Sequence, residues 1–471
     1  MNPLKFRPLA MAILLSLISP ASQAAEEDVR VALDAITVTA QRRAENPQIV
    51  PQSLSVIGGE DVRILGSAGD DILALGARAP SVQAESSFGR TFPRFYVRGL
   101  GNTDFDLNAS QPVAMVYDDV VLENPTLKGF PLFDLDRVEV LRGPQGTLFG
   151  RNTPAGVLKF ESVRPAPDTD GYLRLAWGRY DTAQLEGALG GAIGADSAAR
   201  ISLLHQRRDD TVVNTRIPGD RRGGYDESAL RAQWLLSPTD GFEALLSLRA
   251  RTLDGGSAIY QSNLFVPGSN QLRPDFRPDR LAQDARPELQ LDSRGFSARL
   301  RWDFESVRLH SISAWESVEM FARGDVDGGF GAGFAPPFGV GPIPFPAESG
   351  DGIPSHRQLT QEFRLESTLP GPWTWQLGAL LYDESLRIDN LSYDTLAGSA
   401  VNGVARQRQE HRAYGLYAAG SYQLAERWRV AGGLRYSDDR KDFVAERLSS
   451  PIGAGALGPI LFVPQFRVPT P

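Results

Sequence analysis

The side chains that most often carry catalysis or bind metal ions are scarce in this sequence of 471 residues. It contains no cysteine, which excludes thiolate zinc sites, iron–sulfur clusters and cysteine nucleophiles. It contains four histidines, His205, His310, His356 and His411, and no two of them have the spacing of metal ligands. We interpret each histidine as an ordinary polar side chain. The sequence therefore predicts no catalytic residue, no metal site and no cofactor.

Charge is the other source of chemistry, and its balance argues against a nucleic-acid partner. Lys and Arg number 49 and Asp and Glu 57, a formal net charge of −8, which provides no basic surface for a phosphate backbone. Hydrophobic residues make up 42% of the chain and charged residues 23%, so it can bury a core and is not mostly disordered. Glycine (47) and proline (33) are abundant, which indicates many turns.

Many of the charged residues stand in a regular pattern after Gly171. Apolar side chains recur at every second position, as from Trp373 to Leu381, and this period of two is typical of a strand with one apolar face. Arginines such as Arg231 and Arg299 fall on the opposite face. A dry core holds such residues only when they are paired, so we expect a sheet with one apolar side and one polar side.

The strands are joined by connections of two different lengths. Three of them are tight turns, at 237–240, 369–372 and 424–426. Three are long and rich in glycine, proline and asparagine, at 253–288, 324–357 and 388–408. Short turns that alternate with long loops, on strands with one apolar face, are typical of an outer-membrane β-barrel. A soluble β-sandwich is the alternative.

The N-terminus predicts export. A basic start and an apolar run over 9–18 precede small residues at 22–24, which is the pattern that signal peptidase reads. The run has about half of the roughly 20 residues that a transmembrane helix needs. We therefore interpret residues 1–24 as a signal peptide.

Two regions lie between the signal peptide and the strands, which occupy residues 171–471. Residues 25–50 form a linker with a short β-prone run, which consists of Asp34, Ala35, Ile36, Thr37, Val38, Thr39 and Ala40. Its free backbone groups suit it to add a strand to a partner protein, although it is also compatible with a chance apolar patch. Residues 51–165 combine short strands with short helical turns, so we expect a compact α+β domain there.

Five stretches, in this order and spacing, resemble TonB-dependent outer-membrane receptors. The stretches are LDAITVTAQRR at 33–43, YVRGLG at 96–101, VYDDV at 116–120, DRVEVLRGPQGTLFGRN at 136–152 and QLTQEFRLES at 358–367. The last resembles a strand of the family's barrels, and the other four resemble its plug, with the run at 138–152 the most specific. The resemblance covers the chain from about residue 33 onward.

This resemblance implies an α+β plug domain inside a mainly antiparallel transmembrane β-barrel of about 22 strands, in the outer membrane of a Gram-negative bacterium. It implies a receptor for the active uptake of a scarce, bulky ligand, most often a ferric siderophore in this family. Energy would come through TonB with the ExbB/ExbD complex, and residues 34–40 are similar to the box that pairs with TonB. Outer-membrane lipid would surround the barrel.

The resemblance also suggests roles for single plug residues. The expected turn residues are Gly99, Gly143, Pro144, Gly146 and Gly150, because glycine permits unusual backbone angles and proline fixes φ. We expect Arg98 and Arg142 to act as a latch that pairs with carboxylates of the inner barrel wall. Glu362 is the preferred partner, since the alternation around it turns it inward. Charges that are merely solvated in a wet lumen are the alternative.

Ligand contacts are expected from the plug apices and one barrel loop. The nominated residues are Phe88, Arg90 and Phe92 in one plug stretch, Asn102, Asp104 and Phe105 in another, and Phe330 and Phe334 in the loop 328–345. The loop phenylalanines could form an adaptable aromatic surface for a large ligand. A loop that only covers the barrel mouth is the alternative.

The number of strands does not match a whole barrel. Alternating segments from 172 to 445 give about eleven strands, half of the number that the resemblance implies, and 449–471 does not resemble a closing strand. An open half-barrel would leave edges that lipid does not tolerate. We therefore expect a C-terminally truncated receptor, and a non-functional fragment is one alternative.

Other function classes stay open at this point. A passive porin or adhesin-like barrel would need neither a plug nor a coupling box. A secreted enzyme that acts on polysaccharides would need a paired acid and base, and no such pair can be picked out. The ligand itself could be a siderophore, haem, cobalamin, a nickel complex or a carbohydrate.

Overall fold

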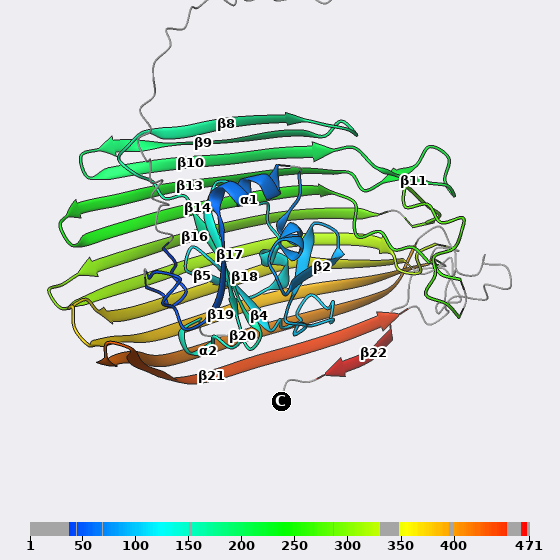
Figure 1. Cartoon of the computed structure of the whole chain (residues 1–471). Helices are drawn as coiled ribbons and strands as arrows, with labels where there is room; N and C mark the ends of the chain where they lie inside the picture. The colour runs from blue at the N-terminus through cyan, green and yellow to red at the C-terminus, as the bar shows by residue number, and fades with distance from the viewer. Residues whose placement is uncertain are drawn as a thin grey trace, which may run out of the picture.

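The structure is a computed structural model. It describes residues 37–43, 45–67, 69–149, 153–262, 264–266, 268–285, 287–329, 348–394, 400–449 and 463–468. Figure 1 shows two units, a small mixed domain that we call the plug and a large curved sheet that we call the wall. Among the described residues, no helix is long and apolar enough to cross a membrane. The predicted signal peptide lies outside the described residues.

The plug is built on a five-stranded sheet in the order β1-β6-β7-β4-β5. Strand β4 runs parallel to β7, and the other neighbours are antiparallel. The strands are β1 (Ser53–Gly58), β4 (Val113–Tyr117), β5 (Val120–Leu122), β6 (Leu135–Arg142) and β7 (Gly156–Ser162). The other elements are the hairpin β2 (Val82–Phe88) and β3 (Thr91–Val97), the α-helices α1 (Gly59–Gly66) and α2 (Gly146–Phe149), and the 3-10 helices η1 (Ile72–Ala77) and η2 (Pro125–Lys128). The predicted α+β domain is confirmed.

A dry apolar core holds the plug together. Phe92, Phe95 and Phe160 are each at most 1% exposed, and burial of such large side chains is the main source of stability in a small domain. The core continues into the wall, where Leu253, Leu289 and other apolar side chains near the long loops pack against it. The plug and this part of the wall therefore share one hydrophobic cluster.

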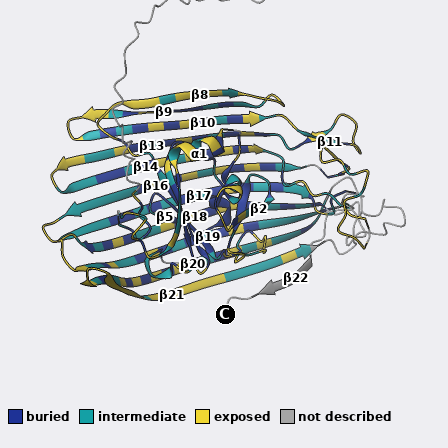
Figure 2. Ribbon diagram, in the orientation of Figure 1, coloured by how far each residue is buried: buried dark blue, intermediate teal, exposed yellow. Residues whose placement is uncertain are grey.

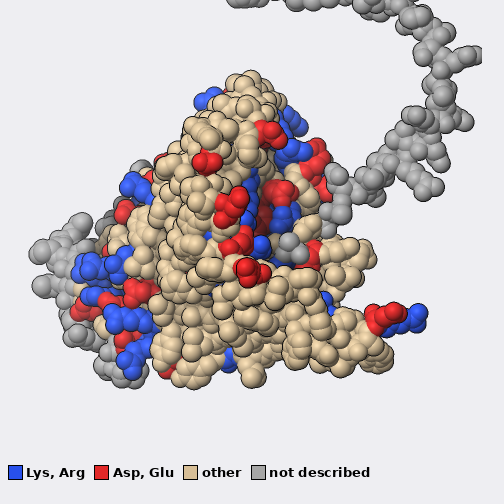
Figure 3. Space-filling model, turned by 90° about the vertical axis from the view of Figure 1, so that its left-hand side faces the viewer, with Lys and Arg blue, Asp and Glu red and all other residues tan. Residues whose placement is uncertain are grey.

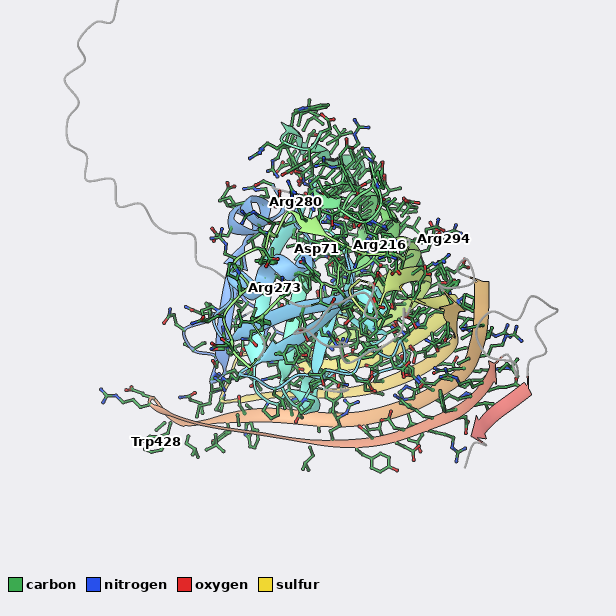
Figure 4. The ribbon with its side chains drawn as sticks, turned by 90° about the vertical axis from the view of Figure 1, so that its right-hand side faces the viewer. Asp71, Arg216, Arg273, Arg280, Arg294 and Trp428 are labelled. Carbon is green, nitrogen blue, oxygen red and sulfur yellow. The ribbon has the colours of Figure 1, made fainter. Side chains whose placement is uncertain are left out.

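The wall is a twelve-stranded sheet in which all neighbouring strands are antiparallel. In order along the sheet its strands are β22 (Val463–Val468), β21 (Trp428–Ser449), β20 (Ala400–Ala425), β19 (Trp373–Asp394), β18 (Glu348–Ser367), β17 (Val307–Asp325), β16 (Glu288–Asp303), β14 (Phe242–Gly255), β13 (Tyr225–Thr239), β10 (Ser197–Arg208), β9 (Ala183–Gly194) and β8 (Asp170–Trp177). The eleven strands expected between 172 and 445 correspond to β8 to β21. Within the described residues β8 and β22 are the edges, and Figure 4 shows the sheet curving round the plug without closing.

The wall strands alternate as predicted. On β19, Leu377 and Leu381 are 46% and 55% exposed on the outer face, whereas Gln376 and Tyr382 are 5% and 4% exposed on the inner face. Figure 2 shows the resulting stripes of exposed and buried residues along the strands. On the inner face of β13, Arg231 is only 1% exposed because the plug covers it. The predicted barrel wall, apolar outside and polar inside, is confirmed.

The long connections are shorter than the sequence predicted. The expected loop 388–408 is mostly strand, since Ile388 pairs with Gln407 and the ladder continues to Asp394 and Ala400. Strands β17 and β18 likewise extend to Asp325 and from Glu348. Beyond the membrane both faces of a strand meet water, so the apolar alternation ends while the backbone pairing continues. Three further short strands, β11 (Val212–Asn214), β12 (Arg221–Arg222) and β15 (Arg280–Leu281), form a small sheet at this end.

Candidate functional site: the plug–barrel interface

The described part of the predicted coupling segment is docked on the plug. Asp34, Ala35 and Ile36 lie outside the described residues. Val38 forms an isolated antiparallel bridge with Glu45, with both N···O distances 2.9 Å, and the side chains of Val38 and Ala40 are fully buried. The expectation of free backbone groups is therefore wrong for Val38, because a local turn brings Glu45 back to pair with it.

Thr39 fixes this segment to a charged pair at the centre of the plug sheet. Its backbone N–H donates to Glu139 Oε1 at 2.9 Å and its hydroxyl donates to the same oxygen at 3.1 Å. Lys159, which faces Glu139 across β6 and β7, also donates to the Thr39 hydroxyl. Arg137 Nε completes the group, 2.8 Å from Glu139 Oε1. Burial lowers the pKa of Arg137, but its bonds and attraction to carboxylates outweigh burial and raise it.

The predicted latch does not form as expected. Arg142 donates to the Pro80 carbonyl at 2.8 Å and to Ser55 Oγ at 2.9 Å, both within the plug. Arg98 is exposed, with a left-handed backbone (φ 54°) at a turn. Neither pairs with Glu362, whose ion-pair partners among the described residues are Arg42 and Arg364. The prediction of this pairing is wrong.

Glu362 does face inward, and its plug partner is Arg42. Arg42 Nη1 lies 3.3 Å from Glu362 Oε2 and 3.5 Å from Oδ1 of Asp119 in the plug. Burial lowers the pKa of Arg42, but these two carboxylates outweigh burial and raise it. The surrounding cations hold the pKa of Asp119 well below its usual value despite its burial. Arg43 next to it donates to the wall, 2.7 Å from the Trp375 carbonyl.

A second contact, which we call the Asp134 contact, joins the plug to β10 and β13. Arg200 binds Asp134 with two bonds, Nη2 to Oδ1 at 2.7 Å and Nε to Oδ2 at 2.8 Å. Arg231 Nη2 lies 2.9 Å from the same carboxylate and also donates to the Asp134 carbonyl at 2.6 Å. All three side chains are at most 2% exposed. Burial raises the pKa of Asp134, but the two guanidiniums outweigh it, so its pKa lies below the usual value.

The predicted ligand residues of the first plug stretch make contacts within the protein. Phe88 is 7% exposed and Phe92 is fully buried, because both side chains face the plug core. Arg90 Nη2 pairs with Glu227 Oε2 of β13 at 2.8 Å, and its guanidinium stacks on Tyr225 at 3.9 Å. Contact of these three residues with a ligand stays a prediction, and it would require Phe88, Arg90 and Phe92 to leave the contacts described here.

The second predicted ligand stretch forms an exposed loop at the apex of the plug. Phe105 is 64% exposed, and Asp104 accepts a hydrogen bond from the Asp106 backbone at 3.0 Å. Asn102 donates to the Ser110 carbonyl at 2.6 Å, which closes the loop. Phe330 and Phe334 lie outside the described residues. The loop 102–108 therefore remains the accessible candidate for ligand contact.

The predicted plug turns are present where glycine is needed. Gly99 and Gly143 have φ of 78° and 86°, angles that favour glycine. Pro144 follows Gly143, and Gly146 begins helix α2 instead of forming a tight turn. Gly150 lies outside the described residues.

Sequence reasoning missed two groupings of polar side chains. His356 Nε2 and His411 Nδ1 lie 3.1 Å and 3.8 Å from the two oxygens of Glu384, on three adjacent strands. Only the strand register brings these histidines together, so their spacing in sequence gave no signal. Near the long loops, carboxylate oxygens of Asp284, Asp325 and Asp327 lie within 4.8 Å of one another.

Comparisons with known proteins agree with this architecture. Residues 46–157 match the model of the TonB-dependent receptor plug domain, and residues 246–456 match the model of the TonB-dependent receptor-like β-barrel. The chain belongs to the TonB-dependent receptors. The structure thus shows how a member of this family places its plug against its barrel wall, and the family places the chain in the outer membrane of a Gram-negative bacterium.

Individual relatives are similar over nearly the whole chain. The pesticin receptor of Yersinia enterocolitica serotype O:8 is 24% identical over 465 residues, which cover 96% of this chain and 63% of the relative. The crystal structure of the ferric yersiniabactin uptake receptor FyuA from Yersinia pestis has a TM-score of 0.72 at 17% identity, covering 88% of this chain and 60% of that one. The ferric-catecholate import receptor Fiu from E. coli K12 has a TM-score of 0.64 at 15% identity, with 89% and 61% covered. The chain thus spans about three fifths of the length of these relatives.

Proposed function

We propose that this receptor takes up a scarce, bulky ligand, a ferric siderophore, actively across the outer membrane, with energy from TonB and the ExbB/ExbD complex. One observation carries the proposal: the coupling segment is tied through Thr39 to the centre of the plug, and through Arg42 and Arg43 to the wall. A passive pore has no use for such a linkage. A pull on this segment would act on both units at their junction.

The docked segment sets the order of events in this proposal. TonB would pair with residues 34–40 by adding a strand, which requires that Val38 gives up its bridge to Glu45. Thr39 would then leave Glu139 and Lys159, two charges that water can solvate once exposed. The Arg42 to Glu362 pair would open last, because it lies deepest between plug and wall.

The nature of the ligand rests on the relatives. Those described above are named as receptors for pesticin, for ferric yersiniabactin and for ferric catecholates. We infer a ferric siderophore as the ligand class, and we assign its first contact on the plug to Asn102, Asp104 and Phe105, whose loop is exposed. Phe330 and Phe334 remain predicted contacts.

The test is uptake of radioactive iron by cells in which this chain is the sole receptor of its type. A panel of catecholate, hydroxamate and phenolate siderophores, with cobalamin as a separate arm, identifies the ligand class. Deletion of residues 34–40 should abolish uptake, whereas passive diffusion would persist. Uptake that survives this deletion would contradict active transport, and uptake of cobalamin alone would contradict the siderophore assignment.

A further inference from the structure

The plug meets two sides of the wall in different ways. On β10 and β13 large polar side chains fill the gap, since Arg200 and Arg231 bind Asp134, and Gln233 Nε2 donates to Ser162 Oγ at 2.9 Å. Tyr225 adds a bond from its hydroxyl to the Gly69 carbonyl at 2.9 Å. Movement of the plug away from this side would leave several buried charges without partners.

Near the tight-turn end of β20 and β21 the wall is lined mostly by small residues instead. A cavity of about 260 Å³ lies between the plug and these strands at the end of the wall that carries the tight turns. Its wall side includes Ala419, Gly420, Ala431 and Gly433, and its plug side includes Thr147 of α2. We call this cavity the β20–β21 groove. Figure 3 views this end and shows charged side chains gathered in a hollow framed by uncharged ones.

Contacts across the groove are single hydrogen bonds and one long ion pair. Arg43 donates to the Trp375 carbonyl at 2.7 Å, and Gln376 donates to the Gln41 carbonyl at 3.0 Å. Arg429 Nη2 lies 3.9 Å from Glu45 Oε1, a longer distance than in any plug–wall ion pair named above. In the described part of the chain, no residue of β20 or β21 belongs to the apolar cluster that plug and wall share. Water can replace contacts of this kind at little cost, so this side can open while the Asp134 contact stays closed.

The wall near β20 and β21 contacts two plug segments that the proposed function uses. One is the exposed loop 102–108, and the other adjoins the coupling segment. At the apex, Lys441 Nζ of β21 lies 3.1 Å from Ser110 Oγ, and Gln407 of β20 bonds the Asp106 carboxyl. These plug residues belong to or adjoin the exposed loop 102–108. At the other end, Gln376 of the neighbouring strand β19, which pairs with Ala419 of β20, donates from its Nε2 to the Gln41 carbonyl at 3.0 Å. Gln41 directly follows the coupling segment, so a pull on that segment acts at the rim of the groove.

We propose that the ligand passes between the plug and strands β20 and β21, while the plug stays bound to β10 and β13 through the Asp134 contact. This inference rests on the proposed uptake function. It assigns the moving contact to the small-residue side of the wall and the fixed contact to the arginine side. A plug that leaves the barrel whole would have to break both.

The absence of cysteine makes a direct test possible. One variant carries Gln41→Cys with Gln376→Cys, and its matched control carries Ser162→Cys with Gln233→Cys. Each pair replaces one glutamine hydrogen bond between plug and wall. A short bis-maleimide then joins each pair in cells, and uptake of the radioactive ferric siderophore is measured before and after. The first variant should lose uptake on crosslinking and the second should keep it.

Two results would overturn the proposal: the reverse pattern, or loss of uptake in both crosslinked variants. If neither variant takes up iron before crosslinking, the proposed function fails, and amide hydrogen exchange on the purified chain in micelles decides the inference. Residues 143–149, which border the groove, should exchange at least about tenfold faster than residues 132–134. Equal or slower exchange at 143–149 would refute it.

A pair of adjacent glycines tests the groove without crosslinking. A Cβ on Gly433 would come within 2.6 Å of Thr147 Cγ2, whereas a Cβ on Gly432 meets nothing within 4 Å. Gly433→Leu should therefore block uptake, and Gly432→Leu should leave it unchanged, with equal amounts of both chains in the outer membrane. Equal uptake by the two variants would contradict a path along β21.

Discussion

The core of the plug and its polar contact with the wall are built from opposite kinds of side chain. Phe95, Leu158 and Phe160 are at most 1% exposed and pack in a dry core. Arg231 and Asp134 are buried as deeply, but they are charged and bind each other. Apolar packing depends on shape and has no substitute in water. A buried charged pair such as Arg231 and Asp134 is also costly to open, whereas the hydrogen bonds at the β20–β21 groove can be exchanged for bonds to water. The plug can therefore stay folded as a domain while part of its contact with the wall is broken and remade.

The largest effect should come from the core. Phe160→Ala removes a fully buried ring that contacts Tyr117 and Phe130, and we expect it to lower the free energy of plug unfolding by about 3–5 kcal/mol. Phe105→Ala is the control, since that ring is 64% exposed; it should change stability by less than about 0.5 kcal/mol. Denaturant unfolding followed by hydrogen exchange of the plug strands measures both. Similar losses in the two variants would contradict the division between core and surface.

The next largest effect should come from the Asp134 contact between plug and wall. Asp134→Asn leaves Arg200 and Arg231 buried against a neutral amide, and we expect it to weaken the binding of plug to wall by about 3 kcal/mol. Asp170→Asn removes only a half-exposed partner of Arg200, so it should cost less than about 1 kcal/mol. Exchange of the backbone amides at 132–135 reports this contact. Protection that is equal in the two variants would show that the Asp134 contact does not hold the plug.

The same contact has a defined pH dependence. Because the pKa of Asp134 in the folded chain lies below its usual value of 3.8, the contact is fully formed above that value and is lost as the pH falls through the lower, folded pKa. Protection at 132–135 should therefore stay constant from neutral pH down to about pH 4. Loss of protection already between pH 6 and 5, where carboxylates of ordinary pKa remain ionised, would contradict it.

The sequence predicted the two units better than it predicted how they meet. The alternation along β18 correctly predicted that Glu362 faces inward, because one face of each strand must be apolar. It could not choose between arginines of the plug, since that choice depends on how the domain is oriented within the wall. Arg142 binds the Pro80 carbonyl and the Ser55 hydroxyl of its own domain, and Arg42, which was not considered, reaches the wall. For the same reason, the sequence did not predict which plug carboxylates bind Arg231 and Arg299.

The predicted ligand residues differ in exposure, and residue type gives the reason. Phe88 and Phe92 flank a turn that was expected to face a ligand, yet large apolar side chains in a small domain are more often needed for its core. The polar and exposed loop at 102–108 had the composition of a surface loop and is one. Likewise, the pairing of His356 and His411 at Glu384 depends on a strand register that a single sequence does not contain.

Replacement of the buried Lys128 should have a smaller effect on stability, and of the opposite sign, since it should stabilise the plug. Burial lowers the pKa of Lys128 to about 8, because the attraction of Glu123 and Glu384 does not offset it. The ammonium donates to Gln111 Oε1 and to the Val113 carbonyl. Since the unfolded chain keeps the proton up to about pH 10.5, the stability of the plug should rise as the pH increases from 8 to 10.5. Lys128→Met should stabilise the plug by about 1–2 kcal/mol at neutral pH and remove this rise. Denaturant unfolding at several pH values checks both, and a destabilised Lys128→Met variant would contradict the argument.

The smallest expected effect on uptake and stability is at Arg98, on the exposed surface of the plug. Arg98 is exposed, forms no ion pair with a carboxylate among the described residues, and adds its positive charge near Arg142, whose pKa is lowered by partial burial and by Arg98. Arg98→Ala should therefore leave iron uptake unchanged and alter stability by less than about 0.5 kcal/mol. Because residue 98 has φ of 54°, Arg98→Gly should be more stable than Arg98→Ala by about 0.5–1 kcal/mol. Loss of uptake in both variants, with the plug still folded, would restore Arg98 as a latch and remove the distinction drawn here between wall contacts and the plug surface.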